Sequence, residues 1–305
     1  MSQRNLAILA AIGATVIYGL NHTIAKGVMP THIKPYGFIF LRVAGGAILF
    51  WCISFLGPKE KIKTKDWGRL FLCAILGMGV NMFSFFKGLE LSTPINSSVL
   101  VTITPIIVVI LSALFIKEKI TLGKGSGIVL GFMGALGLIL YGAEIRQDAP
   151  NIPLGNALIV LNSTTYGAYL IFVKTLIQKY HPFTLMKWLF TIGMIIDLPI
   201  AYPDLAQVHW GQLPLAAIGA MVYVVVCTTF LTYLFNIYAL TQLKASTVSA
   251  FVYVQPLIGI LFALAMGKDD LTLVKVIATI FVLVGVYLAS RKTRASARAL
   301  WRQKR

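Results

Sequence analysis

Charged residues are scarce in this 305-residue sequence, and acidic ones are the scarcest. Charged residues make up 12% of the chain, Asp and Glu together number 10, and 58% of the residues are hydrophobic. A soluble domain of this length cannot bury so large an apolar share, so the composition excludes a soluble globular fold. The chain is therefore predicted to lie in a lipid bilayer.

Motifs for catalysis and metal binding are also missing. Cys52, Cys73 and Cys227 lack the spacing of a metal site, and the chain has neither a His-Glu-x-x-His motif nor an acidic cluster suited to Mg²⁺. No cofactor and no metal are predicted, and an enzyme is not expected. A membrane-embedded enzyme or a scaffold remains a remote alternative. The net charge of +17 does not indicate a nucleic-acid partner, because the basic residues are dispersed over short loops.

Long apolar runs fill most of the sequence. A helix needs about 20 apolar residues to cross the hydrocarbon core of a bilayer. Ten such spans can be placed, which predicts an all-α polytopic membrane protein. They cover about residues 6–28, 37–56, 68–88, 95–116, 123–142, 154–174, 183–202, 213–238, 247–267 and 272–290.

The second half of the sequence repeats the first. Tyr18-Gly19 and Lys26 return as Tyr166-Gly167 and Lys174 at an offset of 148. Two copies of a five-helix unit explain this repetition. Since five is odd, the second copy must be inverted in the membrane, and inverted repeats are typical of secondary transporters. We expect one repeat over residues 1–150, the second over 151–290, and a basic cytoplasmic tail over 291–305.

Lysine and arginine gather in alternate loops. The loops facing the opposite side carry little beyond Lys34, Arg146 and Lys268. The positive-inside rule therefore predicts that both termini are cytoplasmic. The loops on the predicted cytoplasmic side contain Lys59, Lys61, Lys63, Lys65, Lys117, Lys119, Lys124, Lys179 and Lys244.

Polar side chains recur at helical spacing within six of the spans, three from each repeat. Such groups are costly in hydrocarbon unless they face a cavity or a partner. Hydrogen bonding between packed helices explains a single Ser or Thr, whereas this many amides and phenols favour a wet, aromatic-lined cavity. The predicted substrate-binding residues are Tyr18, Asn21, Asn81, Ser84, Thr102, Tyr166, Tyr169, Thr232, Tyr233, Asn236, Tyr253 and Gln255.

Two pairs of repeat-related residues have a predicted role beside this cavity. Lys26 and Lys174 lie near span ends, where they either extend to the membrane interface or attract and gate a substrate carboxylate. Pro105 and Pro256 lie in mid-helix, where a proline removes a backbone donor and produces a kink. Such a kink serves either packing or substrate binding and hinge motion.

Few other ionisable residues are available to a transport mechanism. Arg42 is placed near a span end, so no clear buried charge is expected in the cavity. His22, Glu90 and Asp197 are the residues that could accept a coupling proton, and the sequence leaves proton coupling open.

The motifs of the two halves resemble those of the EamA-type family of the drug/metabolite transporter superfamily. The resemblance covers about residues 5–290, with mild departures at Tyr18, where the family often has Trp, and at Lys117, where it often has Gly. It implies a carrier of the bacterial inner membrane that exports amino acids or other small metabolites. It also implies a central cavity lined by all helices except the fifth and tenth. The motifs are Tyr18-Gly19-Leu20-Asn21 with Lys26, Thr104-Pro105 with Lys117-Glu118-Lys119-Ile120-Thr121, and Gln255-Pro256 with Lys268-Asp269-Asp270-Leu271-Thr272.

The predicted function is export of amino acids or similar small metabolites by alternating access. Multivalent anions are not expected as substrates, because they require several Arg or Lys in the cavity. Import of such metabolites and efflux of amphipathic toxic compounds are the alternatives. The predicted partners are the metabolite and the lipid bilayer, and a homodimer formed through the fifth and tenth helices is left open.

Overall fold

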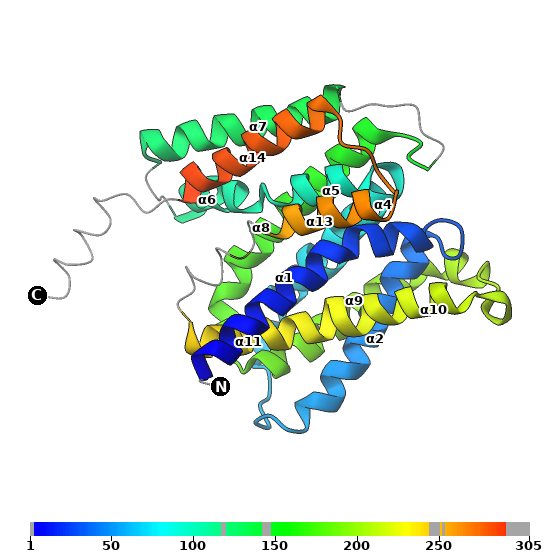
Figure 1. Ribbon diagram of the computed structural model, residues 1–305. Coiled ribbons are helices and arrows are strands. Elements are labelled where there is room, and N and C mark those ends of the chain that lie inside the picture. The colour runs from blue at the N-terminus through cyan, green and yellow to red at the C-terminus, as the bar shows by residue number, and fades with distance from the viewer. Residues whose placement is uncertain (1–2, 117–119, 142–147, 244–250, 252–253, 291–305) are drawn as a thin grey trace, which may run out of the picture.

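The computed structural model describes residues 3–116, 120–141, 148–243, 251 and 254–290. Throughout these ranges the regular structure is helical and no strand occurs (Figure 1). Eight helical stretches are long and apolar enough to cross a membrane, and two shorter apolar helices follow at 255–265 and 273–288. The predicted all-α membrane architecture is confirmed. The ninth predicted span is described at residue 251 and from residue 254 onward.

The first repeat contains the helices up to residue 141. Its third span is one continuous helical stretch with changes of pitch, and its fourth span is broken between two α-helices. The elements are α1 (Gln3–Val28), α2 (Pro35–Ser54), η1 (Thr64–Asp66), α3 (Trp67–Ala74), η2 (Ile75–Val80), α4 (Asn81–Leu91), α5 (Pro94–Val101), α6 (Thr104–Ile116) and α7 (Leu122–Tyr141).

The second repeat has the same succession of spans. Its eighth span changes pitch in the middle, as the third does. The elements are α8 (Ile152–Ile177), α9 (Pro182–Ala206), η3 (Trp210–Gln212), α10 (Leu215–Val222), η4 (Tyr223–Leu231), α11 (Thr232–Gln242), α13 (Gln255–Ala265) and α14 (Leu273–Ser290).

Local sequence explains where several helices begin. Proline stands in the first turn of α2, α5 and α9, where the missing N–H would have no helical partner. The Thr93 hydroxyl accepts a hydrogen bond from the Asn96 N–H, and the Asn151 side chain accepts one from the Leu154 N–H. These caps satisfy backbone donors that the first helical turn leaves free.

Helix contacts recur when the two halves are exchanged. The span α2 packs on its counterpart α9, α7 on α14, and α5 on α13. In the same way α1 packs on α11 as α8 packs on α4, and α1 packs on α13 as α8 packs on α6. This exchange is what two repeats related by a pseudo-twofold axis produce.

Helices α7 and α14 form an outer pair at one edge of the molecule (Figure 1). They approach through backbone, because a Cβ added to Gly285 would lie 2.4 Å from the Gly131 nitrogen. Their other faces expose large apolar side chains such as Val129, Leu136 and Ile280. In a bilayer, lipid tails cover such a face.

The third and eighth spans each contain a π-helical segment in their middle. These segments, η2 and η4, begin at Ile75 and Tyr223, which are 148 positions apart. A π-helical turn is wider than an α-helical turn and changes the direction of the side chains that follow it. The repeat therefore includes a shared irregularity at the depth of the site described below.

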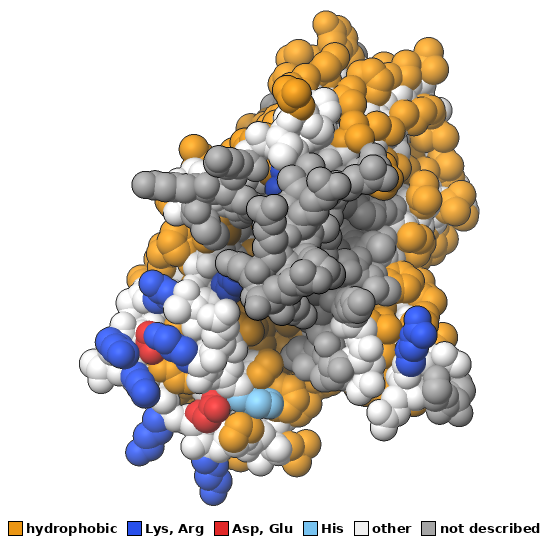
Figure 2. All heavy atoms as spheres, turned by 90° about the vertical axis from the view of Figure 1, so that its left-hand side faces the viewer, with side chains coloured by type: hydrophobic (Ala, Val, Ile, Leu, Met, Phe, Trp, Pro, Cys, Tyr) orange, Lys and Arg blue, Asp and Glu red, His pale blue; other side chains and the backbone are white. Residues whose placement is uncertain are grey.

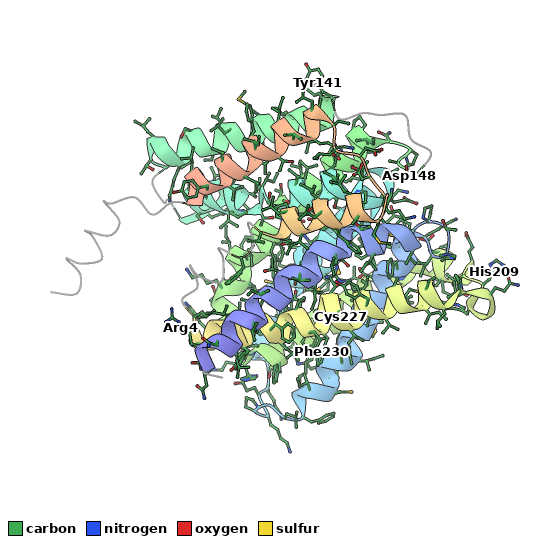
Figure 3. All side chains as sticks on the ribbon, viewed as in Figure 1. Arg4, Tyr141, Asp148, His209, Cys227 and Phe230 are labelled. Carbon is green, nitrogen blue, oxygen red and sulfur yellow. The ribbon has the colours of Figure 1, made fainter. Side chains whose placement is uncertain are left out.

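Opposite ends of the molecule are marked by residues from alternate loops. Arg4 lies at one end, and Asp148 and His209 lie at the other (Figure 3). Figure 2 looks onto the end that carries Arg4 and shows Lys and Arg side chains gathered over its lower part, with apolar side chains above them.

Candidate functional site

Arg42 lies within α2, about 10 Å along the helix axis from its first residue. Its Nε donates a hydrogen bond to the Thr229 hydroxyl in η4 at 2.9 Å, and its guanidinium carbon lies 5.7 Å from the centre of the Phe86 ring. Among the described residues it has no carboxylate partner and no second hydrogen bond. The two terminal nitrogens thus remain available to a ligand.

Three tyrosines from three other spans surround this arginine. Tyr18 of α1, Tyr166 of α8 and Tyr233 of α11 lie close enough for their phenols to interact electrostatically with the guanidinium. The Tyr18 hydroxyl lies 3.1 Å from the Thr232 hydroxyl of α11. We call Arg42 and these three tyrosines the Arg42 cluster. Its members come from both repeats, so the cluster lies where the repeats meet.

One member of the Arg42 cluster is partly accessible. Tyr166 keeps 38% of its surface accessible, although groups from α1, α2 and α11 approach it. Behind it Tyr169 is buried and stacks on Tyr166, with ring centres 5.8 Å apart and an angle of 24° between the planes.

The asparagines that the sequence predicts as substrate-binding residues form hydrogen bonds between helices of opposite repeats. Asn81 and Asn162 each donate a side-chain hydrogen bond of 2.9 Å to the other's backbone carbonyl, which joins α4 to α8. The buried Asn21 accepts a hydrogen bond of 3.2 Å from Thr228 of η4. These contacts serve packing between helices, and substrate contact by Asn21 or Asn81 stays a prediction.

The fourth span is interrupted beside the predicted proline. Helix α5 ends at Val101 and α6 begins at Thr104, with Pro105 as its second residue. The buried Thr102 lies in the interruption, where its hydroxyl donates to the Val99 carbonyl at 2.6 Å.

The ninth span meets the fourth near its own proline. Pro256 is the second residue of α13, and its carbonyl accepts a hydrogen bond of 3.4 Å from Ser98 of α5. A Cβ added to Gly259 would lie 2.4 Å from the Ser98 hydroxyl, so glycine is what lets α13 and α5 approach here. The two irregular helices therefore touch.

The paired lysines have different surroundings. Lys26 is buried, and its Nζ donates a hydrogen bond of 2.5 Å to the Glu90 carbonyl at the C-terminal end of α4. A cation there is stabilised by the helix dipole and by a free carbonyl. Lys174 is exposed near the end of α8. A gating role for either lysine stays a prediction.

The remaining predicted residues occupy three separate helices. Ser84 is buried in α4, Asn236 is partly exposed in α11, and Gln255 opens α13. Tyr253 lies outside the described residues. Substrate contact by these four residues also stays a prediction.

Arg42 brings a charged side chain to the cluster, whereas the sequence predicts no clear buried charge in the cavity. Arg42 was placed near a span end, whereas α2 begins at Pro35 and carries Arg42 two turns into the membrane. Comparison of the two repeats would have pointed to Arg42 from the sequence. An offset of 147 pairs Pro35 with Pro182 and Gly46 with Gly193, and it pairs Arg42 with Leu189, a buried apolar residue. A charge that the scaffold does not require in the other copy points to function.

At the end that carries Arg4, polar contacts join a loop of one repeat to a loop of the other. Asp66 accepts hydrogen bonds from the Lys179 ammonium at 2.8 Å and from the Tyr180 hydroxyl at 2.7 Å. The backbone N–H of His181 donates to the Glu60 carboxylate at 2.7 Å. Burial raises the pKa of the Tyr180 phenol. We call this set of contacts the first clasp.

At the other end, the Asp204 carboxylate accepts hydrogen bonds from the Tyr36 and Gly37 N–H groups at 3.1 and 3.4 Å. Lys34 donates to the Gln207 side chain at 2.6 Å. We call these contacts the second clasp. A pocket of about 330 Å³ adjoins it, and none of the predicted site residues lines this pocket. The two clasps hold both ends of the α2–α9 pair.

A family model described as the EamA-like transporter family matches residues 5–140 and 153–291, one match in each half. A protein of Archaeoglobus fulgidus named an uncharacterized transporter is 32% identical over 85% of this chain and 90% of its own length. A Streptantibioticus cattleyicolor protein named a probable terminal-alkyne amino-acid exporter is 23% identical over 76% of this chain and 75% of its own length.

A solved crystal structure shares the fold. It superposes with a TM-score of 0.61 over 94% of this chain and 98% of its own, at 14% sequence identity.

Proposed function

The chain belongs to the EamA-like transporter family, and we propose that this membrane transporter exports amino acids or similar small carboxylate-bearing metabolites. It does so by alternating access, from the inner membrane of a bacterium, with both termini cytoplasmic. The observation that carries the proposal is Arg42, a cation within a membrane span that pairs with no carboxylate among the residues the structure describes. An ionisable residue at such a depth is retained for function.

The geometry of the Arg42 cluster suits a carboxylate. A guanidinium presents a planar fork of donors that matches the two oxygens of a carboxylate. The Arg42 Nε donates to Thr229, so the two terminal nitrogens of the guanidinium can donate to a substrate carboxylate. The surrounding phenols offer hydrogen bonds, ring faces for an apolar side chain and a surface for the cationic amine of an amino acid.

The same geometry argues against other substrate classes. A multivalent anion needs more than one cation, and no charged group other than Arg42 interacts with the cluster within the described ranges. Efflux of amphipathic cations fits poorly because Arg42 would repel them. The exporter named among the relatives acts on an amino acid by its printed name, which supports the same substrate class.

The two clasps support alternating access. Each joins residues of opposite repeats at one end of the α2–α9 pair. Release of the first clasp would open the Arg42 cluster toward the end that carries Arg4, and release of the second would open it toward the opposite end.

Substitution of Arg42 tests the proposal. Wild-type and variant proteins are reconstituted in liposomes and compared for uptake of labelled amino acids and of the corresponding amines that lack the carboxylate. A hydrogen bond to a charged group contributes about 1.5–3 kcal/mol, so Arg42→Gln should lower amino-acid transport at low substrate concentration roughly tenfold to a hundredfold. Arg42→Lys should recover part of the activity, because it keeps the charge without the fork.

Arg69 supplies the matched control, since it is exposed at the start of the third span. Arg69→Gln removes one positive charge from the same protein and should leave transport near the wild-type rate. Equal loss in both variants, or wild-type transport in Arg42→Gln, would contradict the assignment of Arg42 to the substrate carboxylate.

A further inference from the structure

Asp197 is a buried carboxyl group in the membrane-spanning part of α9. Its accessible surface is 0%, and neither of its carboxyl oxygens has a hydrogen-bond partner within the described part of the chain. Buried polar groups in proteins are nearly always hydrogen-bonded, so an unpartnered acid at this depth needs an explanation.

The carboxyl lies in an apolar seam. It continues a buried stripe of α9 that includes Leu189 and Gly193. One turn away, a Cβ added to Gly193 would lie 2.7 Å from the Met78 Cβ and 3.2 Å from Val43, which shows that this stripe faces the third span and α2. Met82, Phe38 and Ile39 belong to the same buried cluster.

Charged groups of α2, of the third span and of α9 itself bind partners other than Asp197. Arg42 of α2 bonds to Thr229, and Lys87 of α4 forms an ion pair with Glu90. Lys187 of α9 lies over the Trp51 ring at 4.5 Å. The other titratable groups of the packed helices and of α9 itself do not bond to Asp197 either. They are Tyr36, Cys52, Lys65, Asp66, Arg69, Cys73, Tyr166, Tyr169, Lys174, Tyr202 and Asp204.

An ionised carboxylate in this seam would have neither water nor a cation beside it. The neutral acid is far less costly to bury, so Asp197 carries a proton in the conformation seen here. The other two membrane carboxyl or imidazole candidates have partners: the His22 Nδ1 lies 2.9 Å from the Ser97 hydroxyl, and Glu90 pairs with Lys87. Asp197 alone among these three is without one.

We propose that Asp197 is the proton-binding site that couples this transporter to a proton gradient. When the seam between α9, α2 and the third span opens to water on the cytoplasmic side, the carboxyl O–H bond breaks, the proton passes to that water and the carboxylate remains. The carboxylate takes up a proton when the seam opens to the other side. One proton thus moves inward for each substrate exported. The coupling rests on the proposed transport function, whereas the protonated state of Asp197 does not.

The protonation state is tested without any substrate. Infrared difference spectra of purified protein at neutral pH compare the wild type with Asp197→Asn, which has nearly the same shape as the neutral acid and should fold. The C=O stretching band of a protonated carboxyl should be present in the wild type, absent from Asp197→Asn and retained in Glu90→Gln. Glu90→Gln is the matched control because its carboxyl is already ion-paired. A wild-type spectrum without the band overturns the proposal.

Coupling is tested in proteoliposomes with labelled amino acids. For one proton per substrate, a gradient of one pH unit should drive about tenfold accumulation by the wild type and by Glu90→Gln. Asp197→Asn should still exchange labelled for unlabelled substrate but should accumulate none. Accumulation by Asp197→Asn, or wild-type transport that ignores the gradient, overturns the coupling. If no amino acid is transported at all, the proposed function fails while the infrared result still stands.

Discussion

Arg42 and Asp197 are two ionisable residues within the membrane, and their surroundings assign them different chemistry. Arg42 keeps free donors beside accessible phenols, so it suits an anionic ligand. Asp197 is enclosed by apolar side chains and is stable there only in its neutral form. The difference lies in what each side chain contacts, since both residues are in the middle of long apolar helices.

The accessibility of Tyr166 provides a test at the residue scale. In a background without Cys52, Cys73 and Cys227, Tyr166→Cys should react with a hydrophilic thiol reagent added to membranes, because the wet cavity predicted from the sequence would lie beside it. Leu136→Cys is the control, since Leu136 is 50% exposed on α7 but faces lipid. Equal labelling at the two positions, or none at position 166, would count against the predicted wet cavity.

At the scale of elements, the paired π-helical segments position the site. Residues 81 and 229 are repeat-related, since they lie 148 positions apart, and both are held at the π-helical segments. Asn81 bonds to α8, whereas Thr229 bonds to Arg42 and donates to the Val224 carbonyl five residues earlier. The same irregularity thus supports helix packing in one repeat and orients the Arg42 side chain in the other.

Two glycines of η2 give a matched test of this packing. A Cβ at Gly77 would lie 2.8 Å from the Tyr169 ring, whereas a Cβ at Gly79 would meet nothing within 4 Å. Overpacking costs typically about 1–3 kcal/mol, so Gly77→Ala should lower the free energy of unfolding by about that amount and reduce transport. Gly79→Ala should change neither. Thermal unfolding in detergent and the liposome assay measure both effects, and equal stability of the two variants would refute the close contact.

For the whole molecule, pseudo-symmetric packing of two repeats places the Arg42 cluster between them and a clasp at each end. Helices α2 and α9 form one tightly packed pair, and α7 with α14 forms another at the edge. A second copy of the chain bound through this edge stays a prediction. Loops predicted to lie on opposite sides of the membrane do lie at opposite ends, as Arg4 and His209 show in Figure 3.

Reporter fusions test the orientation of the whole chain. Fusions after Lys65 and Lys124 should report cytoplasm, and a fusion after Asp204 should report the opposite side, because the basic loops remain inside. The loop at 148–151 is an independent check, since it should agree with Asp204. A cytoplasmic signal from that loop would contradict the inverted repeat.

The sequence by itself determined the membrane setting, the helical class and the duplication. Apolar spans and repeated motifs are local patterns, and a bilayer forces such spans to satisfy their backbone hydrogen bonds as helices. The sequence also predicted Tyr18, Tyr166 and Tyr233 as site residues, because helical spacing shows which side chains share a face of one helix. It placed Arg42 near a span end and outside the predicted site, because span ends read from a sequence are uncertain by several residues.

Only the tertiary structure decided which polar groups meet. Helical spacing cannot tell whether a polar face meets a recess, a neighbouring helix or a seam. Asn81 donates to the Asn162 carbonyl and Lys26 donates to the C-terminal end of α4, whereas Asp197 has no partner among the described residues. These outcomes depend on the rotation and crossing of helices far apart in the chain, and on π-helical turns that redirect side chains, so no local pattern encodes them.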